Sequence, residues 1–579
     1  MVVIGNPPYS GESNNKGLFE KELEVYKREP TGGKLKERNS KWINDDYVKF
    51  IRFAENLIEK TGEGVLGFIT NHGYLDNPTF RGMRWHLLHT FDRIWVLDLH
   101  GNSKKKEVSP DGSPDRNVFD IMQGVAIIIA VKRKREGKKP KPLAEVRHGD
   151  LWGAREGKYS VLWEGTAGSL MSDVLPHKPP TYPMVQRDYE VEDAYSNGFS
   201  IPDLMPVNSV GIVTARDALA VDIEREALWE RVQDFPRMDA EDLRAKYALG
   251  KDVRDWTVAF AKADVTANFG QGHLVPLAYR PFDTRWTYYT GNSRGFLCYP
   301  RSEVMQHLRG VPNLGAGYTR TIEGDRRFAD ILVSDVPITH HTLSIKEVNA
   351  IAPLYLYPDE QDLDQSIRVN LDPKLYAQIR KAAGLSGPLG VPDPAMVESG
   401  AFRAATGDAR PDEVKVFDYI YGVLHCPAYR ETYAEFLKID FPRVPFPPSP
   451  QVFRTISEQG EGLRRLHLME DAAIGATPYP FDGQPPEGFD SVVDKPRFEN
   501  GRVYINGKGD EGQYFDAVSP VAWDFPIGGY QPAQKWLKDR KGRALSWDDI
   551  RHYQKIIKIL AETDRIMRGI EMPLTDTED

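Results

Sequence analysis

The chain has 579 residues, of which 40% are hydrophobic and 27% are charged, and its formal net charge is −9. This length is too great for one hydrophobic core, so we expect two or three domains. The net charge excludes a generally polycationic surface, but it does not exclude a locally positive face that binds nucleic acid. The longest apolar run, 124–131, is too short to span a bilayer and the first residues lack a secretory signal, so we predict a cytoplasmic protein without a membrane segment.

The chain opens with a short apolar strand, Val2-Val3-Ile4, which runs into Asn6-Pro7-Pro8-Tyr9. Neither proline can donate to a ladder and each fixes its own φ, so the chain must leave the sheet in a rigid turn. The turn presents the Asn6 amide oxygen and the Pro7 carbonyl as two acceptors, with the flat Tyr9 ring beside them. An amino group on an aromatic ring fits this arrangement.

Such an amino nitrogen is a poor nucleophile because its lone pair is spread into the ring. Two hydrogen bonds to its protons favour the tetrahedral form, so the lone pair can attack a methyl group and no general base is needed before attack. The motif therefore predicts an amino-methyltransferase whose catalytic loop is Asn6, Pro7, Pro8 and Tyr9. The alternative is an ordinary Asn-Pro turn.

A site for S-adenosylmethionine normally needs a glycine-rich turn after the first strand of the sheet and an acidic residue after the second. Neither precedes Asn6, and the internal Gly315-Ala316-Gly317 is followed by Tyr318 rather than by a small-residue helix start. A lone Gly-x-Gly is weak support for a nucleotide site. We therefore expect S-adenosylmethionine to serve the intact enzyme, with the cofactor-binding half missing here and weak or no affinity in this chain alone.

The next elements alternate between helix and strand. Hydrophobic periodicity predicts helices over 46–60 and 79–90 and strands over 65–70, 94–99 and 124–131. Asp45 or Asp46 is available as the N-cap of the first helix. Strands that alternate with helices indicate an α/β fold with a doubly wound sheet.

Residues 1 to about 135 resemble the second half of the methyltransferase domain of adenine-specific DNA methyltransferases. The resemblance rests on Asn6-Pro7-Pro8-Tyr9, on Phe-Ile-Thr-Asn at 68–71 with Gly-Tyr-Leu at 73–75, and on Asn-Val-Phe at 117–119 before the apolar run at 124–127. It implies that Asn6 and Pro7 hold the adenine amino group, that Tyr9 stacks on the flipped base and that Phe119 packs on its other side. For Phe119, a core aromatic at a strand start is the alternative.

The remainder, from about residue 170 to 579, resembles the C-terminal specificity region of type ISP restriction-modification enzymes, which join nuclease, translocase, methyltransferase and target recognition in one polypeptide. The shared phrases lie at 279–283, 353–358, 419–425, 429–430, 436–443, 528–530 and 535–537. The nuclease, the helicase motor and the cofactor half have no counterpart in this sequence. A partner chain or an N-terminal region would have to supply them.

The resemblances together imply an α/β fold with a partial Rossmann-like methyltransferase sheet, then a mixed α+β target recognition domain with a helical C-terminal part. We expect methyltransferase sequence at 1–165, target recognition at 166–450 and the helical part at 451–579. Apolar stripes in this region predict helices over 412–424, 428–437, 451–469 and 547–568.

Sequence discrimination in DNA needs basic and amide side chains at base edges and further basic residues on phosphates. Two clusters of basic residues, the first interleaved with aromatics, are candidates for contacts with double-stranded DNA: Arg280, Arg285, Arg301, Arg320, Arg326 and Arg327, then Lys535, Arg540, Lys541 and Arg543. For each single residue, an ordinary place in a half-buried strand or at a solvated helix end is the alternative.

The sequence predicts no metal site. Cys298 and Cys426 have no ligand spacing between them, and no carboxylate or cysteine lies at ligand spacing from His340-His341. We therefore interpret the cysteines as buried thiols and the histidine pair as part of a loop or a packed region.

The sequence thus predicts a site-specific adenine-N6 DNA methyltransferase fragment that binds duplex DNA and receives a flipped adenine. Three alternatives stay open. The chain is a split enzyme that takes its cofactor site from a partner chain, a specificity module without catalysis, or an amino-methyltransferase that acts on RNA or on a protein glutamine.

Overall fold

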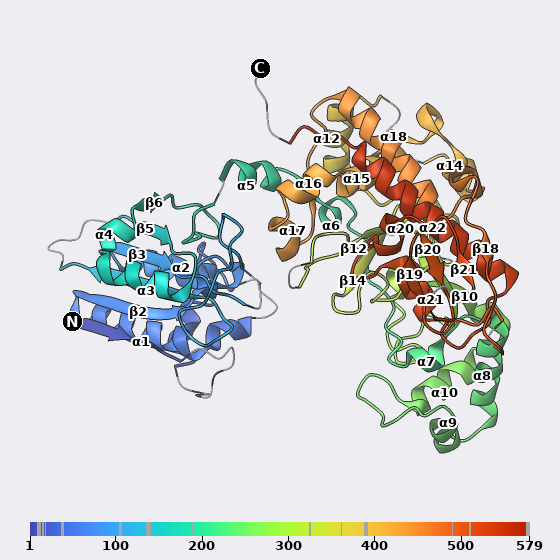
Figure 1. Cartoon of the computed structure of the whole chain (residues 1–579), viewed down its shortest axis with the longest axis horizontal. Coiled ribbons are helices and arrows are strands. Elements are labelled where there is room, and N and C mark those ends of the chain that lie inside the picture. The colour runs from blue at the N-terminus through green and yellow to red at the C-terminus, as the bar shows by residue number, and fades with distance from the viewer. Residues whose placement is uncertain are drawn as a thin grey trace. The chain divides into compact units, whose positions relative to one another are not determined.

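In a computed structural model, the chain forms two compact units, residues 1–188 and 189–579 (Figure 1). The structure describes residues 1–8, 13, 15, 17, 19–35, 40–103, 107–134, 141–187, 189–323, 326–359, 362–386, 392–488, 490–508 and 511–574. Over these ranges, no helix has both the length and the apolar character needed to cross a lipid bilayer.

The first unit is built on a six-stranded sheet in the order β1-β2-β4-β3-β5-β6. Its strands are β1 (Val2–Gly5), β2 (Gly64–Asn71), β3 (Arg93–Asp98), β4 (Val125–Lys132), β5 (Glu145–Asp150) and β6 (Asp173–Leu175). β1 is parallel to β2 and β3 is parallel to β5, whereas β4 pairs antiparallel with both β2 and β3. As a result β1, β2, β3 and β5 run in one direction, and their carboxyl ends meet at one edge of the sheet.

Helices cover both faces of this sheet. On one face α1 (Asp46–Thr61) and α2 (Arg81–Thr90) pack with Leu66 and Ile128 in a buried apolar cluster. On the other face α3 (Arg155–Glu164) and α4 (Ala167–Leu170) pack near Ile127 and Ile129. The predicted helices and strands of this part are confirmed to within two residues, apart from a 3-10 turn at Pro78–Phe80 before α2.

The second unit contains several small sheets, in the strand orders β10-β11-β9, β13-β12-β14-β8, β15-β16, β17-β7 and β18-β21-β20-β19. The strands are β7 (Phe199–Ser200), β8 (Ser209–Val210), β9 (Val221–Asp222), β10 (Leu274–Arg280), β11 (Asp283–Tyr288), β12 (Gly315–Thr319), β13 (Ile331–Ser334), β14 (Asn349–Pro353), β15 (Tyr355–Leu356), β16 (Arg368–Val369), β17 (Arg443–Val444), β18 (Phe481–Asp482), β19 (Arg497–Glu499), β20 (Arg502–Tyr504) and β21 (Tyr514–Phe515). Gly315 and Gly317 thus lie inside a fully buried strand. The chain is a mixed α/β protein.

Its helices are α5 (Tyr189–Ser196), α6 (Ile201–Leu204), α7 (Asp217–Ala220), α8 (Arg225–Arg237), α9 (Ala240–Lys246), α10 (Val258–Ala267), α11 (Ser302–Met305), α12 (Pro373–Ala383), α13 (Pro394–Glu398), α14 (Ala401–Ala404), α15 (Asp412–His425), α16 (Pro427–Thr432), α17 (Phe436–Ile439), α18 (Pro450–His467), α19 (Asp471–Ile474), α20 (Pro520–Asp524), α21 (Pro532–Lys538) and α22 (Trp547–Arg568). The predicted helices that correspond to α15, α18 and α22 are confirmed. The helix predicted over 428–437 is wrong as a single element, because the chain leaves helical geometry at Tyr433, whose buried ring packs against Tyr195.

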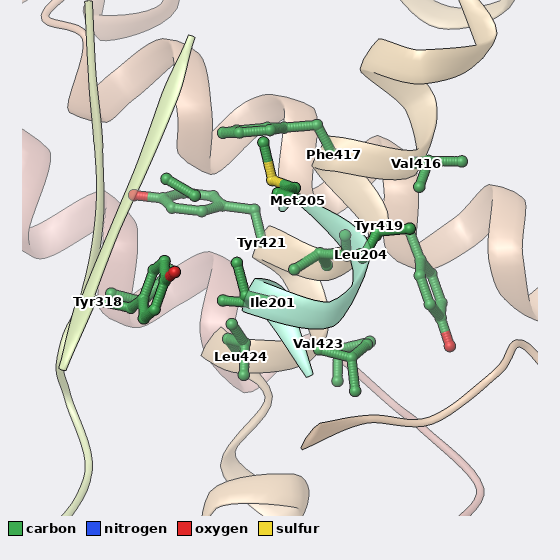
Figure 2. Close-up of a cluster of buried hydrophobic side chains, with 14 of the residues drawn as sticks. Ile201, Leu204, Met205, Tyr318, Val416, Phe417, Tyr419, Tyr421, Val423 and Leu424 are labelled. Atoms are coloured by element: carbon green, nitrogen blue, oxygen red, sulfur yellow. The ribbon is translucent and has the colours of Figure 1, made fainter. Parts of the chain in front are cut away.

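Helix α15 forms the centre of the largest core (Figure 2). The short helix α6 packs its Ile201 and Leu204 against one side of α15, and Tyr318 of β12 lies nearby. The hydroxyl of Tyr421 accepts the backbone N–H of Val333 in β13 at 3.2 Å, so α15 is tied to the sheet by a hydrogen bond as well as by apolar contact.

Two glycines allow α15 and α18 to cross at close range. A Cβ on Gly460 of α18 would lie 1.8 Å from the Asp418 carbonyl oxygen, and one on Gly422 of α15 would lie 2.6 Å from the Ile456 carbonyl oxygen. Both contacts are to backbone, which cannot move aside without separating the helices. A glycine is therefore required at these positions by space rather than by backbone conformation.

We expect Gly460→Ala to lower the free energy of unfolding by about 1–3 kcal/mol or more, because the new methyl group forces the helices apart. Gly462→Ala is the matched control in the same helix. There the added Cβ meets only the Ile566 Cδ1 atom at 3.6 Å, so the better helix propensity of alanine should add roughly 0.5–1 kcal/mol. Urea unfolding followed by circular dichroism measures both, and equal effects would contradict the close crossing.

Candidate functional site

The predicted catalytic loop leaves the sheet from its edge strand. β1 pairs with β2 as far as Gly5, so Asn6 follows the last paired residue directly. Asn6 and Pro8 are exposed and Pro7 is buried, whereas Tyr9 lies outside the described residues. The Asn6 side chain therefore stands at the carboxyl edge of the sheet, where a ligand can reach it. The roles of Asn6, Pro7, Pro8 and Tyr9 stay predictions.

β1 lies at the end of the sheet, and its face opposite α1 is exposed and apolar. Val2 and Ile4 are 65% and 81% exposed, and within the described part of the chain β1 pairs with β2 alone. Phe50 and Phe53 on the neighbouring helix α1 are also exposed, at 43% and 41%. An exposed strand edge presents unpaired backbone groups and readily accepts a further strand.

In three strands of the first unit, every second side chain faces the core, and at the end of each strand the side chains in this row are polar. The rows are Phe68, Thr70 and His72 at the end of β2, Ile94, Val96 and Asp98 in β3, and Val146, His148 and Asp150 in β5. Alternate residues share one face of a strand, and these three strands end at the same edge of the sheet. Their polar side chains consequently gather at one place, beside the apolar core.

Asp98 lies at the centre of this group. Its carboxylate is 3.1 Å from His72 Nδ1 and accepts the backbone N–H of His100 at 2.9 Å. The His100 Nε2 atom lies 2.8 Å from Asp150 Oδ1, and the His100 ring stacks on Trp152 with ring centroids 3.3 Å apart. A chain of polar contacts therefore runs from His72 through Asp98 and His100 to Asp150.

Burial shifts the protonation equilibria of this group. Burial alone raises the pKa of Asp98, but the hydrogen bond and charge of His72, together with the charge of His100, hold that pKa below its ordinary value. Burial lowers the pKa of His148, although the carboxylate of Asp150 acts in the opposite direction. His148 is 1% exposed, and neither of its ring nitrogens has a hydrogen-bond partner in the described structure. A buried ionised carboxylate among imidazoles can hold a proton or a cation.

A cavity of about 650 Å³ opens next to this group, within the first unit. Its lining residues are His72, Leu75, Asp76, Asp98, His100, Glu107, Pro110, Asp150, Trp152, Val185, Gln186 and Arg187. Four carboxylates against one guanidinium give the cavity a net acidic character. Such a cavity favours a cation or an amino group over a phosphate.

Phe119, the predicted second stacking residue, lies on the other side of the sheet from the acidic cavity. Its half-buried ring packs with the cluster that contains Leu97 and Val125. Its backbone N–H donates to the Asn117 side-chain oxygen at 2.9 Å, and its carbonyl accepts from the Arg155 guanidinium at 2.9 Å. These contacts suit the core-aromatic alternative, and base stacking by Phe119 stays a prediction.

Three of the predicted DNA-contacting arginines have internal partners in the second unit. Arg540 is 5% exposed, pairs with Asp283 at 3.0 Å and lies over the Trp536 ring. Arg285 pairs with the other oxygen of the same carboxylate at 2.7 Å. Arg280 is 8% exposed and donates to the backbone carbonyl of Tyr279 at 2.6 Å. Their guanidinium groups therefore contribute to the interior of this unit.

The other residues predicted to contact DNA fall into a half-buried group and an exposed group. Arg301, Arg326, Lys535 and Arg543 are half-buried, and the last three form ion pairs with Asp330, Asp539 and Glu224 respectively. Arg320, Arg327 and Lys541 are exposed. Arg320 lies 2.8 Å from Asp440 and Lys541 lies 4.0 Å from Asp494. Contact of any of the ten with DNA stays a prediction.

Two family models of restriction-modification proteins match this chain. Residues 203–569 match the family model of the Type ISP C-terminal specificity domain, and residues 1–104 match that of the Eco57I restriction-modification methylase. The first match covers more than half of the chain, so the chain belongs to the Type ISP specificity-domain family. The resemblance to type ISP enzymes is confirmed. Among curated proteins, no relative matches.

Solved structures share this fold at low sequence identity. A DrdV–DNA complex superposes with a TM-score of 0.61 at 19% identity and covers 99% of this chain and 57% of its own. The ATP-dependent Type ISP enzyme LlaBIII bound to DNA gives a TM-score of 0.62 at 18% identity, over 99% of this chain and 37% of its own. A nuclease-deletion mutant of the Type ISP enzyme LlaGI, in complex with a DNA substrate mimic, gives 0.57 at 18% identity, over 98% and 44%. This chain therefore spans less than two thirds of each of these proteins.

We expect Arg540→Gln to lower the free energy of unfolding by about 1–3 kcal/mol, because it removes one of the two guanidinium groups that hold the buried Asp283 while Arg285 remains. The adjacent Lys541 is the matched control, since its side chain is 64% exposed. Lys541→Gln should change stability by less than about 0.5 kcal/mol. Urea unfolding of both variants measures the difference, and equal stabilities would show that the Arg540 pair contributes nothing to the fold.

Proposed function

We propose that this chain is the methylase and specificity part of a type ISP-like enzyme that methylates the N6 amino group of adenine at specific sites in duplex DNA. The observation that carries the proposal is the place of Asn6. It is exposed directly after an edge strand, at the carboxyl edge of an α/β sheet, where such sheets bind ligands. The membership of residues 203–569 in a specificity-domain family supports the choice of DNA as substrate.

In the proposed reaction the Asn6 oxygen and the Pro7 carbonyl accept hydrogen bonds from the adenine amino group, and Tyr9 stacks on the extruded ring. These acceptors favour the tetrahedral nitrogen that forms during attack on a methyl group. They contribute positioning and electrostatics rather than proton abstraction. The base must first leave the duplex, so recognition of DNA by the second unit precedes this step.

S-adenosylmethionine is the proposed source of the electrophilic methyl group, yet the described turns of the first unit lack the glycine-rich sequence that normally holds it. None of the turns that follow β1, β2, β3 and β5 in the described structure has a Gly-x-Gly sequence. The backbone edge of β1, which pairs with no strand other than β2 among the described residues, is where a strand of a cofactor-binding segment would pair. We therefore propose weak or no cofactor binding by the chain alone, and a second segment that completes the site.

We assign methylase function to residues 1–165, target recognition to 166–450 and a supporting role to residues 451–579, which contain the sheet β18-β21-β20-β19 as well as the expected helices. Helices α18 and α22 support the last assignment, because α18 packs on α15 and α22 packs on α18. For contacts with DNA phosphates we propose Arg320, Arg327 and Lys541, whose side chains are exposed. Arg280, Arg285 and Arg540 would act by holding the recognition surface in shape.

The test starts with selection of bound sequences from a pool of random duplexes by the purified chain. The complete enzyme, with its cofactor-binding segment, is then assayed for methylation of the selected duplex. We expect Asn6→Ala to lower the methylation rate by roughly 100- to 1000-fold, the usual cost of one preorganised hydrogen-bonding group. The binding affinity of Asn6→Ala for the duplex should stay unchanged.

Asn197→Ala is the control, because Asn197 is an exposed asparagine of the second unit. Its methylation rate should equal that of the unsubstituted enzyme. Specific binding together with an unaltered rate in Asn6→Ala would reject the catalytic role and leave a specificity module. Methylation that appears only when a separate polypeptide is added would identify a split enzyme.

A further inference from the structure

The side chains of His72, Asp98 and His100 offer three ligand atoms that all lie within 4.8 Å of one another. All three side chains are buried, and they follow β2 or end β3 at the carboxyl edge of the first sheet. We propose that these three residues bind a divalent transition-metal ion with the ligand preferences of zinc. The proposal does not depend on the methylation function, which uses no metal.

The spacing of the donor atoms fits a metal ion. The Asp98 Oδ1 atom lies 3.1 Å from His72 Nδ1 and 3.7 Å from His100 Nδ1. Zinc bonds to nitrogen and oxygen at roughly 2.0–2.2 Å in tetrahedral geometry, which places neighbouring ligand atoms about 3.3–3.6 Å apart. The ligand atoms of His72 and His100 lie within 4.8 Å of each other, so an ion could lie between the three atoms once these two side chains move closer together. Two imidazoles and one carboxylate are a ligand set that zinc and its neighbours in the first transition row accept.

The surroundings supply the second shell that such ligands need. His100 Nε2 lies 2.8 Å from Asp150 Oδ1, so this nitrogen can donate to a carboxylate while Nδ1 faces Asp98. The amide of Asn102 lies 3.3 Å from His72 Nε2, and it can accept that N–H with its oxygen after rotation of the amide. Hydrogen bonds of this kind fix the tautomer and orientation of a metal-binding imidazole.

His148 is an independent indication of a ligand at this place. It is 1% exposed, and both ring nitrogens lack a hydrogen-bond partner in the described structure. Its Nδ1 lies 3.6 Å from Asp150 Oδ2, beside the group. A buried imidazole without hydrogen-bond partners costs free energy, so a polar ligand beside it would stabilise the fold. The sheet face thus carries three histidines around two carboxylates.

The proposed ion would keep an exchangeable position. Three protein ligands with one open position is the arrangement of zinc sites that bind a further ligand, whereas purely structural sites are closed by four. The open position would face the cavity of about 650 Å³, because His72, Asp98 and His100 all contribute to its lining. The negative charge of Asp76 and Glu107 on the same wall favours a cation there.

The test uses the full, untagged chain after removal of metals with a chelator and dialysis. Isothermal titration with zinc should give one bound ion per chain, and cobalt should give the visible absorption of a four- or five-coordinate site. His72→Gln and His100→Gln should weaken zinc binding by more than about 100-fold, and Asp150→Asn, which alters the second shell, by about 10- to 100-fold. His89→Gln is the control, because His89 is an exposed histidine of the same unit, and it should bind normally.

Failure of the unsubstituted chain to bind zinc or cobalt stoichiometrically would overturn the proposal, and so would binding that persists in both His72→Gln and His100→Gln. Circular dichroism establishes that each variant is folded. If a variant is not folded, the nitrogen resonances of the histidines in the unsubstituted chain decide whether zinc binds at this site. Zinc should shift the Nδ1 signals of two histidines in the unsubstituted chain, and the same two signals should shift in His89→Gln. Unchanged histidine signals would mean that His72 and Asp98 form a hydrogen bond only.

Discussion

The pairing of β4 with both β2 and β3 determines where the chemistry of the first unit can lie. Every residue of β4 pairs antiparallel with β2, and β3 pairs antiparallel with its other side. Both faces of the strand are covered, since Ala126 and Ile128 face one core and Ile127 and Ile129 the other. Residues 124–131 form a continuous apolar run because both faces of this strand are buried. Because β4 is reversed, β3 keeps the direction of β1 and β2, and the loops after all three strands share one edge.

Buried carboxylates held by two arginines form the polar interior of the second unit. Asp418 of α15 lies 2.6 Å from both Arg464 Nε and Arg410 Nη1, and Asp283 is held in the same way by Arg285 and Arg540. A buried charge must be paired, so two guanidinium groups at each carboxylate offset its desolvation. The arginines of these two clusters therefore contribute to the interior of the second unit. Exposure distinguishes residues available to a ligand from those that hold the unit together.

Periodicity allowed the elements to be predicted, but not their directions or the buried polar clusters. The helices α1, α18 and α22 follow from apolar stripes, whereas the antiparallel direction of β4 depends on pairing between segments far apart in sequence. His340 and His341 drew attention as neighbours in sequence, yet each ring nitrogen Nδ1 simply bonds a backbone carbonyl, of Ile212 and Ser344 respectively, at 2.9 Å. Adjacent residues in a chain need not converge on one ligand.

The histidines that do converge come from separate strands. His100 lies two residues after Asp98, whereas His72 reaches Asp98 only through the pairing of the sheet. One signal was present in the sequence. The alternating apolar residues of β3 continue as Asp98 and His100, and those of β5 as His148 and Asp150, so a polar residue takes the next core-facing position in each strand. A polar residue at a core-facing position costs free energy unless its side chain is paired. Such a residue at the end of a strand therefore indicates a candidate functional site.

The acidic character of the cavity bears on the proposed use of the same sheet edge by DNA. Phosphates and carboxylates repel each other over about one Debye length, roughly 8–10 Å at moderate salt. A cavity with Asp76, Asp98, Glu107 and Asp150 therefore opposes the approach of a polyanion to its opening at this sheet edge. A divalent ion at Asp98 would offset two of these negative charges and give the open coordination position to an oxygen ligand. The proposed metal ion would then lower the net negative charge of the cavity, so its occupancy would influence DNA binding more than the chemistry at the amino group.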